Sequence, residues 1–385
     1  MFILRRYERI WSDLLFFHLS QVFIYFWQVI RILNIIFFLL NVVAVAALFL
    51  SYASIYINPD IFYIPAFFGL AYPFILLANI LLILYWVFQL HLKFIMSLTA
   101  IIAGWSFVGR TVQFHSKSTT NEKAIKVMSY NVMNFGFDKN QNSREDILNL
   151  IAEEQPDILC MQEFCSNKNW NVNIEKKIAD ALHTKYYFFN NVNTGNKLFK
   201  VGTIIYSKFP IKNSGIISYD MSTANSTIFI DIEINGIAVR VFDVHLQSIR
   251  FQPKDYDFLK TVGDNSDQTI NESKSIISRM RTAYVLRASQ AKKVQEAIKQ
   301  SPGKVILCGD FNDSPVSFVY SKINEGLKDA FVESGTGMGR SYAGEFPSFR
   351  IDYIMGSQSL DLNSFQIIHK KYSDHFPIKT MISVK

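Results

Sequence analysis

Two long stretches near the N-terminus, residues 32–57 and 61–90, contain no Asp, Glu, Lys or Arg. About 20 apolar residues let a helix cross the ~30 Å hydrocarbon core of a bilayer. Prolines such as those in the second stretch are tolerated where neighbouring helices satisfy the freed backbone groups. A shorter uncharged stretch, residues 94–108, follows. The sequence therefore predicts an all-helical membrane region, residues 1–110, with about three transmembrane helices at these positions.

Residues 14–29 are apolar but include His18, Gln21 and Gln28, and they leave no room for a turn before the first span. We interpret them as an interfacial helix or as an extension of that span. Basic residues favour the cytoplasmic side, so the arginines that precede residue 32, together with Lys93, place the N-terminus inside. Three spans then put everything after residue 110 outside the cytoplasm. A separate crossing by residues 14–29 would reverse this orientation.

The composition becomes polar at residues 111–124, which we predict to be a linker. Residues 125–385 have the size of one large domain, in which short apolar or alternating runs outnumber helical patterns. This mixture is typical of an α/β layer fold. The predicted strands are 125–130, 158–161, 186–189, 203–206, 227–234, 238–245, 305–307, 351–355 and 379–384, and the predicted helices are 143–154, 174–182 and 282–300.

One polar segment, residues 248–281, is too long for an ordinary connection. It is either a solvated surface excursion or a segment that covers a substrate. The three cysteines, Cys160, Cys165 and Cys308, lack the spacing of zinc ligands and are expected to be buried free thiols. The formal net charge of +7 over 385 residues is too mild to indicate a nucleic-acid-binding groove.

Polar side chains stand at the ends of several predicted strands. A carboxylate that follows an apolar strand is costly to bury unless it is paired or bound to metal. Each such residue alone is explained by a turn or a core hydrogen bond. The domain contains no GxSxG, P-loop or HExxH motif that would indicate another kind of site. The joint occurrence of polar residues at so many strand ends therefore indicates one composite polar site. Its candidate members are Asn131, Glu163, His245, Asp310, Asn312, Asp352, Asp374 and His375.

These residues lie in six short motifs, which are SYNV, MQEF, DVHLQ, GDFND, RIDYI and SDHFPI. Their order over residues 125–385 resembles the endonuclease/exonuclease/phosphatase superfamily, which includes DNase I, deadenylases and neutral sphingomyelinases. The resemblance implies a four-layer α/β sandwich and hydrolysis of a phosphoester with Mg²⁺ or Mn²⁺. Membrane-anchored bacterial relatives look similar, which implies the bacterial inner membrane. The basic residues that flank the spans then place residues 125–385 outside the cytoplasm.

The resemblance implies a divalent-metal site made by Asn131, Glu163 and Asp374. Glu163 is the strongest of these candidates because hard Mg²⁺ prefers oxygen ligands and uses only one or two carboxylates. Asn131 would coordinate the metal or orient its neighbours. Asp374 would join through a metal-bound water.

The resemblance also implies a catalytic group of five residues, which are His245, Asp310, Asn312, Asp352 and His375. His375 would lie at the phosphate, with Asp352 accepting its other ring N–H and fixing the tautomer. Asp310 would align or deprotonate the attacking water. The sequence leaves open whether Asp310 or His375 activates this water. Asn312 and His245 would donate to the phosphate, and His245 is the alternative donor to the leaving group.

Four further residues are weaker candidates. Arg350, Tyr342 and Arg340 would bind the substrate phosphate, with surface positions as the equal alternative. Asp243 shares a strand face with His245, because side chains alternate with period two. Asp243 would therefore touch the metal shell or make a core hydrogen bond.

The sequence thus predicts a membrane-anchored phosphodiesterase whose partners are a phosphoester substrate and the lipid bilayer, and it indicates no protein partner. A lipid phosphodiester is an attractive substrate because tethering raises the effective concentration of the site near lipid headgroups. The alternatives are an extracytoplasmic DNase or RNase and a catalytically silent, membrane-anchored binding module.

Overall fold

The computed structural model of the protein describes residues 2–115, 123–139, 143–170, 172–192, 198–219, 225–249, 255, 267–344 and 349–385. The chain divides into two compact units. The first comprises Met1–Leu50 and Tyr72–Gly104, and the second comprises Ser51–Ala71 and Trp105–Lys385. The segment Ser51–Ala71 contains the end of the first predicted span, the connection after it and the beginning of the second. It belongs to the unit that holds the predicted site.

The first unit is entirely helical. It contains most of α1 (Phe2–Ala53), together with α3 (Tyr72–Phe88) and α4 (Phe94–Ala103). Ser97 donates to the amide oxygens of Asn41 and Asn79, so buried polar groups of all three helices bind one another. Such interhelical hydrogen bonds are a common means of association for helices that lack a hydrophobic driving force in lipid.

One helix in the described part of the chain is by itself long and apolar enough to cross a membrane, at Tyr25–Ala53. This helix is consistent with a membrane anchor. Two bent helix pairs pass the same test together, α2 (Ile64–Leu70) with α3 and α4 with α5 (Trp105–Thr111), which gives up to three spans. Helix α1 runs without a break through residues 14–29, so these residues extend the first helix.

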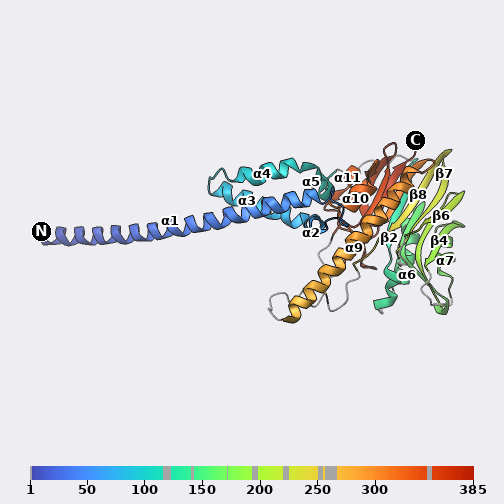
Figure 1. The fold of residues 1–385 in the computed structure, drawn as a ribbon, viewed down its shortest axis with the longest axis horizontal. Helices are drawn as coiled ribbons and strands as arrows, with labels where there is room; N and C mark the ends of the chain where they lie inside the picture. The colour runs from blue at the N-terminus through green and yellow to red at the C-terminus, as the bar shows by residue number, and fades with distance from the viewer. Residues whose placement is uncertain are drawn as a thin grey trace. The chain divides into compact units, whose positions relative to one another are not determined.

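The second unit is built on two six-stranded sheets (Figure 1). The first sheet has the order β13 (Asp361–Ile367), β14 (Ile378–Ser383), β2 (Ile125–Asn131), β3 (Ile158–Asn167), β5 (Phe199–Ser207) and β4 (Tyr186–Val192). The second has the order β10 (Leu327–Asp329), β12 (Asp352–Ser357), β9 (Lys304–Asp310), β8 (Ile237–His245), β7 (Thr227–Ile234) and β6 (Asn213–Ile217). A short pair, β1 (Gln113–Phe114) with β11 (Thr336–Gly337), lies apart from both sheets.

The two sheets pack face to face, and helices cover their outer faces. On β2, Val127 enters the core between the sheets, while Met128 packs with α6 (Arg144–Glu154) and α7 (Ile174–Ala181). On β9, Ile306 enters the same central core, and Leu307 packs with α9 (Asp267–Lys299) and α10 (Phe318–Ile323). This alternation follows from the period of two in a strand, and the predicted four-layer α/β sandwich is confirmed.

All nine predicted strands and all three predicted helices of residues 125–385 correspond to elements of the structure, whereas β1, β6, β10, β11 and β13 were not predicted. The short elements α10, α11 (Ala330–Ser334), η1 (Met133–Lys139) and η2 (Lys168–Trp170) were also missed. Within the predicted loop 248–281, residues 267–281 are helical, because α9 begins at Asp267. Residues 250–254 and 256–266 lie outside the described part of the chain. All three cysteines are buried and free, as predicted.

Candidate active site

Three neighbouring strands of the second sheet bring three candidate residues into line. Strand β8 runs parallel to β9, with His245 paired to Asp310 in the register. Strand β12 runs antiparallel to β9 on its other side, with Asp352 also paired to Asp310. Because paired residues of adjacent strands are direct neighbours, residues far apart in the sequence lie in one row. Asp310 is the middle member of this row.

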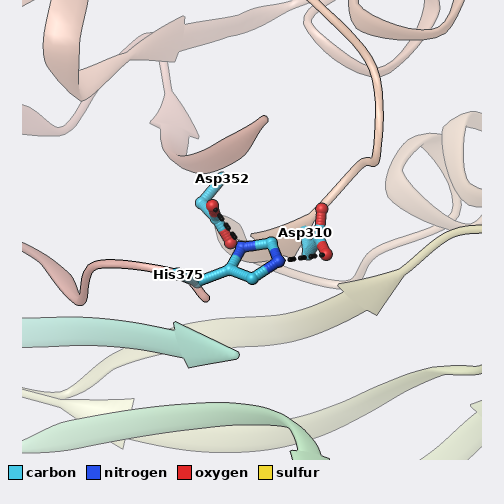
Figure 2. A group of neighbouring side chains, drawn as sticks. All are labelled: Asp310, Asp352 and His375. Atoms are coloured by element: carbon cyan, nitrogen blue, oxygen red, sulfur yellow. Dashed lines mark hydrogen bonds and ion pairs between the residues drawn. The ribbon is translucent and has the colours of Figure 1, made fainter. Parts of the chain in front are cut away.

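His375 lies between two of these carboxylates (Figure 2). Its Nδ1 is 2.9 Å from Asp352 Oδ2, and its Nε2 is 3.7 Å from Asp310 Oδ2. The segment that carries His375, just before β14, is held by the backbone bridge between Tyr342 and His375. The hydrogen bond to Asp352 fixes the ring orientation and leaves Nε2 facing Asp310.

Burial and the neighbouring charges shift the pKa values of His375 and Asp310. Burial alone would lower the pKa of His375, but Asp352 and Asp310 outweigh it and raise this pKa well above its ordinary value. Burial raises the pKa of Asp310 to about 6, with Asp352 adding to the effect and His375 opposing it. A carboxyl group with this pKa is poised to exchange a proton near neutral pH.

Glu163 enters the site from the other sheet through a backbone irregularity. The pairing of β3 with β5 shifts register between Met161 and Phe164, and Glu163 has a positive φ of 49°. A bulge of this kind re-aims a side chain, and left-handed strain in a non-glycine residue is common at functional sites. The Glu163 side chain keeps 32% of its surface exposed, and its Oε1 lies 3.6 Å from His245 Nε2.

Asn131, at the end of β2, connects the two sheets at the site. Its Nδ2 donates to Glu163 Oε1 at 3.3 Å and to Asp310 Oδ2 at 3.1 Å. Its Oδ1 accepts the Met133 N–H at 3.0 Å. Of the two roles expected for Asn131, these contacts support the one in which it orients its neighbours. A single amide thereby sets the spacing of two carboxylates from different sheets.

Asn312 is held tightly behind Asp310. Its backbone has a φ of 53°, its N–H donates to Asp310 Oδ1 at 2.7 Å, and its Nδ2 donates to Leu246 O at 3.0 Å. Asn225, which the sequence did not single out, donates to the same carbonyl at 2.8 Å and lies 3.2 Å from His245 Nε2. Its position just before β7 follows no apolar run, so no pattern in the sequence indicated it.

The donor set fits a divalent cation. Asp310, Asp352 and His375 offer ligand-type atoms that all lie within 4.8 Å of one another. The Asp352–His375 hydrogen bond already occupies part of this group, however, and a hard cation prefers oxygen. The partly exposed Glu163 carboxylate is therefore the better metal ligand, and the Asp310–His375–Asp352 group is better suited to proton transfer. Asp374 is half-buried next to His375 and contributes to the raised pKa of that histidine.

Two of the weaker candidates take other roles. Arg350 is only 4% exposed, and its guanidinium binds Asp329 Oδ2 at 2.7 Å and Arg110 O at 2.8 Å. The prediction that Arg350 binds phosphate or lies on the surface is therefore corrected, because its donors hold the end of α5 against the sheet. Asp243 is fully buried and accepts a hydrogen bond from Gln162 Nε2 at 2.5 Å, which favours the core hydrogen bond over contact with the metal shell.

The remaining two candidates differ in position. Tyr342 lies beside His375, with ring centroids 5.4 Å apart in an edge-to-face arrangement. It is therefore placed to contact a group bound at that imidazole. Arg340 is exposed, and its Nη2 contacts Met338 Sδ at 3.0 Å. Within the described part of the chain, Arg340 makes no hydrogen bond or ion pair with the group around Asp310.

Replacing Arg350 with Met is expected to lower the free energy of unfolding by about 3–5 kcal/mol, because Asp329 would keep a buried charge without its partner. Arg340→Met, an exposed site with the same substitution, is the control and should change stability little. Denaturant unfolding of the purified full-length chain, followed by near-UV circular dichroism, measures both. Equal midpoints for the two variants would contradict the structural role of the pair.

Comparison with known proteins supports this fold. The model of the endonuclease/exonuclease/phosphatase family matches residues 128–375, and a model of a domain of unknown function matches residues 34–111. No curated protein matches the chain. The human nocturnin catalytic domain with bound sulfate is 18% identical, with a TM-score of 0.50 over 69% of this chain and 97% of that one.

A family protein from Leptotrichia buccalis is 19% identical, with a TM-score of 0.47 over 68% of this chain and 100% of that one. One from Bacteroides thetaiotaomicron is 18% identical, with a TM-score of 0.48 over 68% and 98%. At these identities the solved structures bear on the fold alone. The family model covers more than half of the chain, and its match extends over all the candidate residues from Asn131 to His375. The chain therefore belongs to the endonuclease/exonuclease/phosphatase family, whose members hydrolyse phosphoric esters.

Proposed function

We propose that this protein is a membrane-anchored, Mg²⁺- or Mn²⁺-dependent phosphodiesterase that acts on a lipid phosphodiester. The observation that carries the proposal is the placement of His375 between Asp352 and Asp310, next to the Glu163 and Asn131 side chains of the other sheet. A catalytically silent binding module would have no need for this buried and costly arrangement of charges.

The residues of the site divide the work of hydrolysis. Asp352 holds the His375 ring, so that Nε2 faces Asp310 and is expected to reach a phosphate bound beside that carboxylate. Asp310, with its pKa of about 6, is ionised at neutral pH and accepts a proton from the attacking water. Asn312 and His245 are the donors expected to bind the phosphate oxygens, where charge develops in the transition state.

A divalent cation would be held by Glu163, with Asn131 orienting that carboxylate and Asp374 joining through water. When bound, it supplies neutralisation of phosphate charge and stabilisation of the leaving oxygen. In the proposed orientation, the N-terminal helices anchor the protein in a bacterial inner membrane, and the catalytic unit lies on the extracytoplasmic side. The anchor supports a lipid substrate because a tethered site meets headgroups at high effective concentration.

Chelation tests the metal requirement. The purified full-length chain in detergent is expected to release p-nitrophenol from bis-p-nitrophenyl phosphate with Mg²⁺ or Mn²⁺, to lose this activity with EDTA, and to regain it when Mg²⁺ is added in excess. Activity that survives EDTA after extensive dialysis would exclude the proposed cation. The assay follows absorbance and needs no knowledge of the physiological substrate.

A substrate panel then separates lipid from nucleic acid. Vesicles of sphingomyelin and of phosphatidylcholine should release a water-soluble headgroup product, measured by mass spectrometry. Supercoiled plasmid and single-stranded RNA serve as the competing substrates. Cleavage of nucleic acid at a rate that falls steeply with salt, without lipid hydrolysis, would establish the nuclease alternative in place of the proposed function.

A further inference from the structure

The loop that follows the catalytic strand β9 is buried on both sides. Asp313, Ser314 and Val316 are each 3% exposed or less. On one side, Arg287 of α9 binds Asp313 Oδ2 at 3.2 Å, and the Tyr353 hydroxyl donates to Asp313 O at 2.8 Å. These contacts come from α9 and from β12, and they hold this side of the loop.

The other side of the same loop is held by the segment Ser51–Ala71, which leads from the end of α1 through α2 to the start of α3. The Ser54 hydroxyl lies 2.8 Å from Val316 O and shares its proton with Ser51 O, at 2.6 Å. The Ser314 hydroxyl donates to Gly69 O at 3.1 Å. Both hydrogen bonds are buried, so neither is exchanged readily for a bond to water. Two residues from outside the family domain thus bind the loop next to Asn312.

Gly69 makes this contact possible. A Cβ at position 69 would lie 2.2 Å from Val316 O and 2.5 Å from Ser54 Oγ, distances that force the backbone to move. The approach of α2 to the loop is therefore closer than any other residue would allow. By contrast, a Cβ at Gly109 of α5 would meet nothing nearer than Gln113 Nε2 at 3.8 Å.

Aromatic contacts extend the same attachment to α9. The Phe67 ring packs edge-to-face on Tyr284, with centroids 5.2 Å apart, and the Arg281 guanidinium lies 4.9 Å from the Tyr63 ring. From α9, Arg287 also donates to Gln247 O at 3.0 Å, next to the Leu246 carbonyl that accepts from Asn312. The segment Ser51–Ala71 is thus connected to the Asn312 side chain by two routes, the loop and α9.

We propose that the segment Ser51–Ala71 is a positioning element of the active site, which fixes the loop 312–316 so that Asp310 and Asn312 are held in their reactive arrangement. The proposal rests on the proposed hydrolase function for its effect on rate, while its effect on the loop is independent of that function. Hydrolysis is then coupled to the chain segment between two membrane helices, and a disturbance there changes the turnover number without touching the substrate.

The test compares two glycine variants of the full-length chain, Gly69→Ala and Gly109→Ala. For Gly69→Ala, kcat on bis-p-nitrophenyl phosphate is expected to fall about 100-fold, the scale of a ~1 Å misplacement. The Mg²⁺ concentration for half-maximal rate should stay near the wild-type value, because Glu163 lies on the other sheet. Gly109→Ala should keep the wild-type kcat. Equal kcat values for the two variants would overturn the proposal.

Hydrogen exchange gives a readout that needs no activity. Peptides covering residues 311–317 should lose protection in Gly69→Ala and keep it in Gly109→Ala, as measured by mass spectrometry. Unchanged protection in Gly69→Ala would overturn the proposal even if the enzyme were active. An inactive wild type whose loop loses protection in Gly69→Ala would refute the proposed function and retain the positioning element.

A gentler variant covers the case in which Gly69→Ala does not fold. Ser314→Ala removes the hydroxyl that binds Gly69 O and adds no atoms, so the chain should fold with a melting temperature close to that of the wild type. Its kcat is expected to fall about 5-fold, the scale of one hydrogen bond. A folded Ser314→Ala with wild-type kcat and wild-type loop protection would contradict the proposal.

Discussion

Replacing His375 with Asn is expected to lower kcat for Mg²⁺-dependent hydrolysis of bis-p-nitrophenyl phosphate by about 10⁴-fold, the upper range for a positioned proton-transfer group. Asn retains an N–H that can bind Asp352, so that carboxylate is not left buried without a partner. It cannot carry the proton that the imidazole shares with Asp310. The loss should therefore lie in kcat, with the free energy of unfolding close to that of the wild type.

The control for His375→Asn is His183→Asn. His183 is exposed and has a φ of 53°, a conformation that Asn tolerates well. This variant should retain the wild-type kcat. Steady-state kinetics and thermal unfolding of both variants in the same detergent provide the comparison. If His375→Asn kept more than a tenth of the wild-type kcat, the Asp310–His375–Asp352 group would not be the centre of proton transfer.

Replacing Glu163 with Gln is expected to lower kcat/KM by about 10³-fold, the upper range for the loss of one positioned electrostatic contact. The amide is the same size as the carboxylate but carries no charge, so the proposed cation loses its strongest ligand. The affinity for Mn²⁺, measured by isothermal titration calorimetry on the substrate-free protein, should fall as well. That measurement separates loss of the metal from loss of a later step.

Glu153→Gln makes the same substitution on the exposed face of α6 and should leave both kcat/KM and Mn²⁺ affinity unchanged. If the Glu163→Gln variant bound Mn²⁺ as tightly as this control, Glu163 would not be the metal ligand, and the metal site would have to lie elsewhere. The group formed by Asp310, Asp352 and His375 would then be the next candidate, because its ligand-type atoms already lie close together.

The fold was readable from the sequence where each strand had a buried face of its own. The run at residues 227–234 alternates along its length and coincides with β7. By contrast, β6 and β13 have mixed, partly exposed patterns, because both lie at sheet edges, and no period separated them from turns. Helix α9 begins inside a stretch so polar that only its tertiary setting distinguishes it from a loop.

The residues of the candidate site could be predicted because they stand at the ends of predicted strands. The contacts that each of them makes could not be predicted. The sequence placed Asp310 and His245 at the ends of separate strands, and the register pairs them as neighbours. It gave no sign that Arg350 would find Asp329, because this partner lies on a short edge strand that was not predicted. The bulge that turns Glu163 toward Asn131 and His245 also depends on pairing with a distant strand.

The buried contacts of the segment Ser51–Ala71 bear on how this enzyme can be dissected in the laboratory. Excising residues 1–120 would remove Gly69 O from Ser314, Ser54 Oγ from Val316 and Arg110 O from Arg350 in a single step. Polar groups that lose a buried partner in this way weaken the surrounding structure. The smallest portion of the chain that retains the native loop 312–316 is therefore expected to begin upstream of Ser54, inside α1.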